Sequence, residues 1–88
     1  MITTAIIKYI IHNKKLYNVK QIEYRALNHI YLFILTNNDN SREQILSIDR
    51  SIINDVCVDL EKNNTATVNN NLVLAKYLSK EDKVLLAL

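Results

Sequence analysis

Residues 22–46, IEYRALNHIYLFILTNNDNSREQIL, carry the strongest secondary-structure signal in this 88-residue chain. The first part of the stretch has the three-and-four spacing of one helical face. Its apolar positions are Ile22, Ala26, Leu27, Ile30, Phe33 and Ile34. The run then stops in four consecutive Asn or Asp residues, at positions 37–40, which are typical of a tight turn. The sequence therefore predicts a helix that ends before Asn37.

A second helix is expected directly after this turn. Ser41 is followed three residues later by Gln44. The Ser41 hydroxyl can accept a hydrogen bond from the Gln44 backbone N–H, while the Gln44 side chain bonds back to the Ser41 N–H. This capping box predicts a helix from Ser41 to Ile48. Two helices joined by so short a turn pack at a fixed angle, as they do in a helix-turn-helix unit.

The segment after Asp49 allows two interpretations. In the first, Ser51 is the N-cap of a third helix that runs to about Lys62. In the second, one uninterrupted helix runs from Ser41 to Lys62. Both interpretations place apolar residues in a stripe, the first with Ile52, Ile53, Val56 and Leu60, the second with Ile45, Ile48, Ile52, Val56 and Leu60. Only a break near Asp49 makes a helix-turn-helix.

The two ends of the chain add shorter elements. Residues 3–11 fit a helix and a strand equally well, and residues 16–19 fit a returning strand after a polar turn. Residues 65–68 and 72–78 flank Asn69-Asn70-Asn71 and predict a β-hairpin. Ser79 is expected to cap a last helix with acidic residues in its first turn. This helix ends in Leu85, Leu86 and Leu88, which need a cover from the chain's own core or from a second copy.

Composition limits the chain to one small domain, residues 1–88, with one core. It has no Gly and no Pro, so we expect Asn to form the turns, since Asn tolerates left-handed backbone better than most residues. The lone Cys57 cannot form an internal disulfide, and we see neither a secretory leader nor an apolar run of the ~20 residues that a membrane helix needs. A cytoplasmic protein without membrane contact is expected.

Two segments resemble a known family. IEYRAL followed by SREQIL is similar to the winged-helix DNA-binding domain of the OmpR/PhoB and ToxR-like transcription regulators. That family has a T-E-F-R-x-L-like start of the first helix and an S-R-E-x-L-like second helix. DRSIINDV, residues 49–56, resembles the D-R-T-V-x-x-x-I opening of its recognition helix. A competing register matches residues 58–71 and 78–88 to the opening strands and first helix of a ToxR-like domain.

The first register covers about residues 5–78 and implies an α+β fold. The implied fold is a winged helix-turn-helix with a three-helix core, a C-terminal β-hairpin, small N-terminal strands and a short C-terminal helix. The expected function is a transcription regulator that binds double-stranded DNA, as a homodimer formed through the C-terminal helix. Its DNA contacts would be side chains suited to bases or phosphates. They are Arg42, Arg50, Ser51, Asn54, Lys62, Asn70 and Lys76.

The third helix departs from this family because its acidic residues outnumber its basic ones. Asp49, Asp55, Asp59 and Glu61 stand against Arg50 and Lys62. Phosphate neutralisation by Lys and Arg supplies much of the affinity for DNA. The alternative function is therefore a protein-interaction module, such as a regulator antagonist, an adaptor or a phage or immunity-type inhibitor, on a winged-helix-like or helical scaffold.

Catalysis and metal binding have no support in the sequence. His12, His29 and Cys57 lack the paired spacing of zinc ligands. Phosphate-cradling loops require glycine, which the chain lacks. We therefore expect no enzyme activity, no metal and no cofactor.

Overall fold

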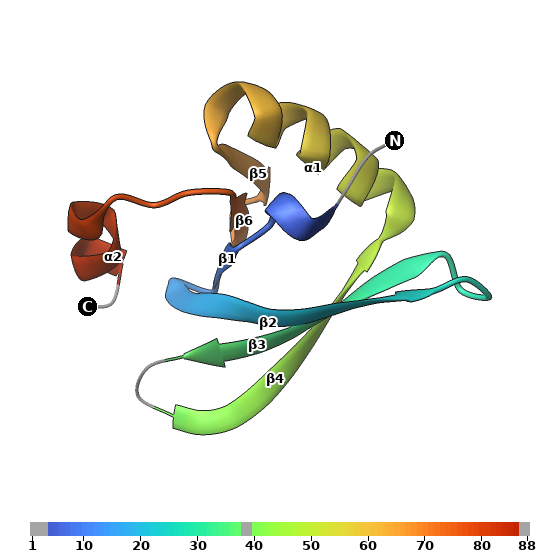
Figure 1. The fold of residues 1–88 in the computed structure, drawn as a ribbon, viewed down its shortest axis with the longest axis horizontal. Coiled ribbons are helices and arrows are strands. Elements are labelled where there is room, and N and C mark those ends of the chain that lie inside the picture. The colour runs from blue at the N-terminus through green and yellow to red at the C-terminus, as the bar shows by residue number, and fades with distance from the viewer. Residues whose placement is uncertain (1–3, 38–39, 87–88) are drawn as a thin grey trace.

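The computed structural model describes residues 4–37 and 40–86, which form an antiparallel sheet with helices beside it (Figure 1). In chain order, the elements are the 3₁₀ helix η1 (Thr4–Ile6), strands β1 (Tyr9–His12), β2 (Lys15–Arg25), β3 (Ile30–Asn37) and β4 (Asn40–Asp49), helix α1 (Arg50–Asn63), strands β5 (Thr65–Asn69) and β6 (Leu72–Ala75), and helix α2 (Lys80–Leu86). Within these residues the sheet has six strands in the order β4-β3-β2-β1-β6-β5. All its described pairings are antiparallel.

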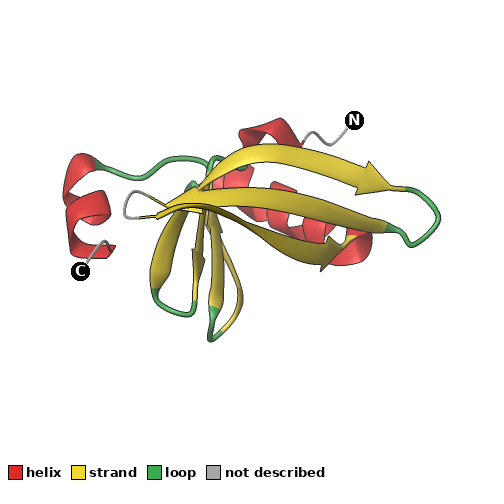
Figure 2. Ribbon diagram, turned by 90° about the horizontal axis from the view of Figure 1, so that it is seen from below, coloured by secondary structure: helices red, strands yellow, loops and turns green. Residues whose placement is uncertain are grey.

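The sheet is strongly bent, and α1 packs on one of its faces (Figures 1 and 2). The register shifts between Val19 and Gln21 of β2, which marks an irregularity of the β-bulge type. Bulges bend a strand and increase its local twist. Beyond this shift β2 runs with β3 and β4 in a different direction from β1, β5 and β6 (Figure 2), whereas its first residues pair with β1. We call the face that meets α1 the inner face and the opposite one the outer face.

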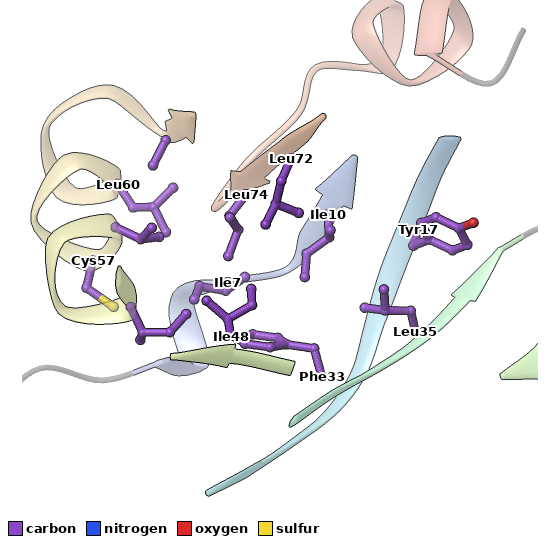
Figure 3. Packing of buried hydrophobic residues seen from close by; sticks show 13 residues of the cluster. Ile7, Ile10, Tyr17, Phe33, Leu35, Ile48, Cys57, Leu60, Leu72 and Leu74 are labelled. Atoms are coloured by element: carbon purple, nitrogen blue, oxygen red, sulfur yellow. The ribbon is translucent and has the colours of Figure 1, made fainter. Parts of the chain in front are cut away.

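The core lies between the inner face and α1. Ile10, Phe33 and Leu74 from the sheet and Ile53 and Leu60 from α1 are each 0% exposed. Figure 3 shows side chains of β1, β3, β6 and α1 meeting in one cluster with Ile7. The four buried residues of α1 are Ile53, Val56, Cys57 and Leu60. Their spacing of three, one and three residues gives α1 a single apolar stripe, which is what fixes the helix on the sheet.

The two helices predicted for residues 22–48 are wrong. Residues 22–25 belong to β2, residues 26–29 form a loop, and residues 30–37 form β3. Residues 40–49 are strand β4, so the helix that Ser41 and Gln44 were expected to cap does not exist. The predicted turn at 37–40 instead joins β3 to β4, and its residues 38–39 lie outside the described part.

β3 imitates a helix because it is apolar on both faces. Phe33 and Leu35 are buried on the inner face, whereas the neighbouring Leu32 and Ile34 are half-buried on the outer face. Strands covered on both faces lose the alternation of apolar and polar residues. An apolar run without alternation contains three-and-four spacings by chance, so the periodicity could not separate strand from helix. Tertiary pairing to β2 and β4 decided the structure.

Several local predictions are confirmed. Of the two interpretations after Asp49, the separate helix is the correct one, since α1 (Arg50–Asn63) matches the expected third helix. Its N-cap is Asp49 rather than Ser51, and a strand rather than a helix precedes it. The hairpin around Asn69–Asn71 is present as β5 and β6. The Ser79 hydroxyl accepts from the Asp82 N–H at 3.0 Å, and Asp82 accepts from the Ser79 N–H at 3.3 Å, so α2 has the expected cap. For residues 3–11 the structure has η1 and β1.

A winged helix-turn-helix is therefore excluded as the fold of this chain. The described residues contain one long helix and a six-stranded antiparallel sheet, where a winged helix needs three core helices. The element before α1 is a strand, so α1 is not the second half of a helix-turn-helix. The fold implied by the OmpR/PhoB resemblance is corrected accordingly.

Candidate interaction surface

Three of the predicted site residues, Arg50, Ser51 and Asn54, do lie together at the start of α1. Their neighbourhood is the end of β4 and the hairpin loop between β2 and β3. The Arg50 backbone N–H donates to the His29 carbonyl at 2.8 Å, which ties the beginning of α1 to this loop. These three residues thus lie on the helix where they were expected, although that helix follows a strand.

Several polar groups of this cluster already form hydrogen bonds within the protein. Asp49 Oδ1 accepts from the Ser51 backbone N–H at 2.9 Å and from the Ser51 hydroxyl at 2.8 Å. These two bonds, led by the backbone one, hold the pKa of Asp49 below its ordinary value, because they favour the charged carboxylate. A carboxylate at this position already complements the positive end of the helix dipole. The start of α1 is therefore a capped helix end and not a vacant anion site.

Arg50 is fixed against an aromatic pair on the neighbouring strands. Its Nη1 donates to the Tyr24 hydroxyl at 3.2 Å, and this bond is the main cause of a raised Arg50 pKa. The Tyr24 and Tyr31 ring centroids are 4.8 Å apart, with their planes tilted by 39°. Tyr24 and Tyr31 lie opposite each other in the β2–β3 register. The contacts hold the guanidinium over the sheet at the strand–helix junction.

The other predicted DNA contacts are scattered over the molecule. Arg42 lies on β4, and Lys62 lies in the last turn of α1, where a cation suits the helix dipole. Asn70 lies in the β5–β6 turn, and Lys76 follows β6, with its N–H bonded to the Asn64 carbonyl at 2.8 Å. These residues do not form one continuous basic face with Arg50. The exposed side of α1 carries Asp55, Asp59 and Glu61, which would repel a phosphate backbone.

The sequence did not predict a strand at residues 40–49, and so it did not predict the sheet edge that β4 forms. β4 is the last strand on its side of the sheet, and within the described residues it packs against β3 and the start of α1. Strands at a sheet edge present unpaired N–H and C=O groups that can bind another strand. The opposite edge, β5, is only five residues long, and its exposed residues are polar (Thr65, Thr67 and Asn69). The two edges therefore differ in what they offer to a partner.

The alternation of hydrogen bonds along the β3–β4 pair shows which β4 residues direct their backbone N–H and C=O groups away from β3. The Arg50 N–H to His29 carbonyl bond lies one step beyond the Ile30–Asp49 pair of the β3–β4 register. Hydrogen-bonded pairs alternate along an antiparallel ladder. Tyr31–Ile48 and Phe33–Leu46 are thus the bonded pairs. It follows that Ile45 and Ser47 direct their backbone N–H and C=O groups away from β3, toward solvent.

Side chains on the outer face of β4 combine an apolar centre at Ile45 with acidic residues toward both ends, Glu43 and Asp49. Ile45 is 69% exposed, and its neighbour across the register is Ile34, which is half-buried. Two residues before Ile45, the Glu43 carboxylate forms an ion pair with the Lys20 ammonium of β2. Since this pair is exposed, it is worth little for stability, and Glu43 stays an acidic side chain on this face. No local sequence signal marks β4, because only Ile45 and Ile48 among its residues are β-branched and its place follows from long-range pairing to β3.

The described residues offer little for metal binding, thiol chemistry or membrane insertion. No group of three or more His, Cys, Asp or Glu side chains there is arranged to hold a metal ion. The Cys57 thiol is buried, and its pKa is raised, first by this burial and then by the charge of Glu61. Neither α1 nor α2, as described, has the length and apolar character of a membrane-crossing helix.

Comparison with known proteins adds no relatives to this picture. No family model, curated protein or solved structure matches the chain.

Proposed function

We propose that this chain is a protein-interaction module that binds an extended segment of a partner protein along the outer edge of β4. The observation that carries the proposal is the outward-directed backbone around Ile45 and Ser47, together with an Ile45 side chain that is 69% exposed. Strand addition of this kind gains affinity from main-chain hydrogen bonds and specificity from alternate side chains. The role is one of binding rather than catalysis.

The side chains of β4 indicate which kind of partner segment would fit. Its residue opposite Ile45 should be apolar and β-branched, because such cross-strand pairs stabilise a sheet. The residue opposite Glu43 should be uncharged or basic, since a like charge directly opposite is destabilising. We propose a reducing cytoplasm as the setting, in keeping with the single, buried Cys57.

The test compares protein capture by three forms of the chain, immobilised at low density and exposed to a lysate of the source cells. Ile45→Lys puts a charge on the outer face of the edge, while Val58→Lys makes the same change at an exposed position of α1 (48% exposed). We expect proteins that are retained by the unchanged chain and by Val58→Lys but lost with Ile45→Lys. Identical capture by all three forms would contradict the proposal.

A second readout locates the contact. In the complex with a retained partner, hydrogen exchange at the Ile45 and Ser47 amides should slow, because those N–H groups would then donate to the partner strand. The Leu46 and Ile48 amides already face β3 and should change little. Protection confined to another element would place the binding site elsewhere.

A further inference from the structure

We propose that the β4 edge recognises a second copy of this chain, with the two β4 strands antiparallel about a two-fold axis at Ile45. The inference rests on the proposed function, because it names an occupant for the same edge. Closed two-fold pairing uses one surface patch twice, so the patch must complement itself. β4 must therefore match its own sequence when two copies pair antiparallel.

Geometry first restricts the registers. Residues opposite each other in antiparallel strands share a face, so outer-face residues must meet outer-face residues. The outward-directed backbone groups of Ile45 and Ser47 must also meet outward-directed groups of the second copy. A two-fold axis at Ile45 satisfies both conditions. Ile45 then lies opposite Ile45 of the second copy, and Glu43 lies opposite Ser47 of the second copy.

Charge selects this register among its neighbours. Moving the axis to Leu46 brings Glu43 opposite Asp49 of the second copy, and like charges directly opposite are destabilising. Moving it to Gln44 brings Glu43 opposite Ile45 of the second copy, so that a carboxylate packs against an isoleucine side chain. The axis at Ile45 leaves Glu43 with its Lys20 partner and places the Ser47 hydroxyl beside it.

The same register continues an existing apolar row. Ile34 of β3 already lies opposite Ile45. Across the two-fold axis the row becomes Ile34, Ile45 and then Ile45 and Ile34 of the second copy, on the outer face of one continuous sheet. Burying two isoleucine side chains that are each 69% exposed in the single chain removes apolar surface from water. One contact thus pairs the outward-directed backbone groups of β4 and buries the exposed Ile45 side chain.

The experiment measures the mass of the isolated chain by sedimentation over a concentration series. We expect the mass to rise from the 10.2 kDa of the single chain toward twice that value. Ile45→Lys and Ile45→Glu, each alone, should stay at the single-chain mass, because each puts like charges on the axis. Val58→Lys is the matched control and should associate as the unchanged chain does. Circular dichroism verifies that each variant is folded.

Mixing the two charged variants tests the register itself. Lys and Glu lie opposite each other only if position 45 faces position 45, so an equimolar mixture should regain the double mass. A mixture that stays at the single-chain mass overturns the register. A double mass retained by Ile45→Lys alone overturns the assignment to β4.

The outcome also separates this inference from the proposed function. If the unchanged chain keeps the single-chain mass even at millimolar concentration, self-pairing is overturned. Capture of other proteins that depends on Ile45 would then leave the proposed function standing. Absence of both would overturn both.

Discussion

Asp49 is the residue at which the two halves of the fold meet. It is the last residue of β4 and the N-cap of α1, with extended backbone at φ −61° and ψ 143°. Because its pKa in the folded protein is lowered, the carboxylate stabilises the folded state fully above the ordinary pKa of 3.8. This contribution is lost as the pH falls through the lower folded pKa. Below both values the cap no longer favours folding through its charge.

The prediction for Asp49 compares two substitutions. Asp49→Asn keeps an oxygen that can cap the helix but loses the charge, so it should lower the urea midpoint at pH 7 less than Asp49→Ala does. On acidification to about pH 2, the unchanged chain should lose more stability than Asp49→Asn, because only the former has a titrating cap. Asp59→Asn, at an exposed position in the middle of α1, is the control. Equal acid sensitivity of the unchanged chain and Asp49→Asn would contradict this role.

At the scale of an element, α1 ends because Asn64 adopts the left-handed conformation. Asn64 is the C-cap at φ 65°, and its backbone N–H donates to the Leu60 carbonyl at 3.1 Å. We expect Asn64→Val to lower the free energy of unfolding by about 1–2 kcal/mol, since a side chain at Cβ is strained in this conformation. Asn64→Gly should keep or raise it, because glycine has no such strain. Urea unfolding followed by circular dichroism measures both.

The neighbouring Asn63 is the control for this prediction. It is the last residue of α1 itself and is exposed. Asn63→Val should change the free energy of unfolding by less than about 0.5 kcal/mol, as expected for a surface position without special backbone geometry. Similar losses for the two Val variants would mean that the left-handed cap does not limit α1.

The elements that the sequence predicted correctly are those with local signals. α1 has one apolar stripe and the residues that end it, and α2 has the Ser79–Asp82 cap. The β5–β6 turn is stabilised locally, since Asn69 Oδ1 accepts from the Asn71 N–H at 2.8 Å. β3 and β4 lacked such signals, because β3 is apolar on both faces and β4 is placed at the edge only by long-range pairing. The same rule applies to the surfaces: the helix that carries Arg50 could be predicted from the sequence, and the β4 edge could not.

For the molecule as a whole, stability depends on where an apolar side chain lies in the bent sheet. Phe33 and Leu27 were expected on the same helical face, but the structure separates them completely. Phe33 is 0% exposed on the central part of β3, while Leu27 is 97% exposed in the β2–β3 loop. Phe33 lies opposite Ile22 on one side and Leu46 on the other, so it connects three strands to the core. The two residues should therefore contribute very differently to folding.

Phe33→Ala is expected to lower the free energy of unfolding by about 3–5 kcal/mol, because it removes a buried ring and leaves a cavity. Leu27→Ala should change it by less than about 0.5 kcal/mol. Since small domains have a free energy of unfolding of only about 5–15 kcal/mol, Phe33→Ala should leave the chain folded but much closer to unfolding.

Urea unfolding measures the difference, and the rate at which a thiol reagent labels Cys57 provides an independent measurement. This thiol is 2% exposed, so faster labelling reports more frequent opening of the core. Labelling should accelerate in Phe33→Ala and stay unchanged in Leu27→Ala. Equal effects of the two substitutions would contradict the assignment of Phe33 to a buried strand and of Leu27 to a loop.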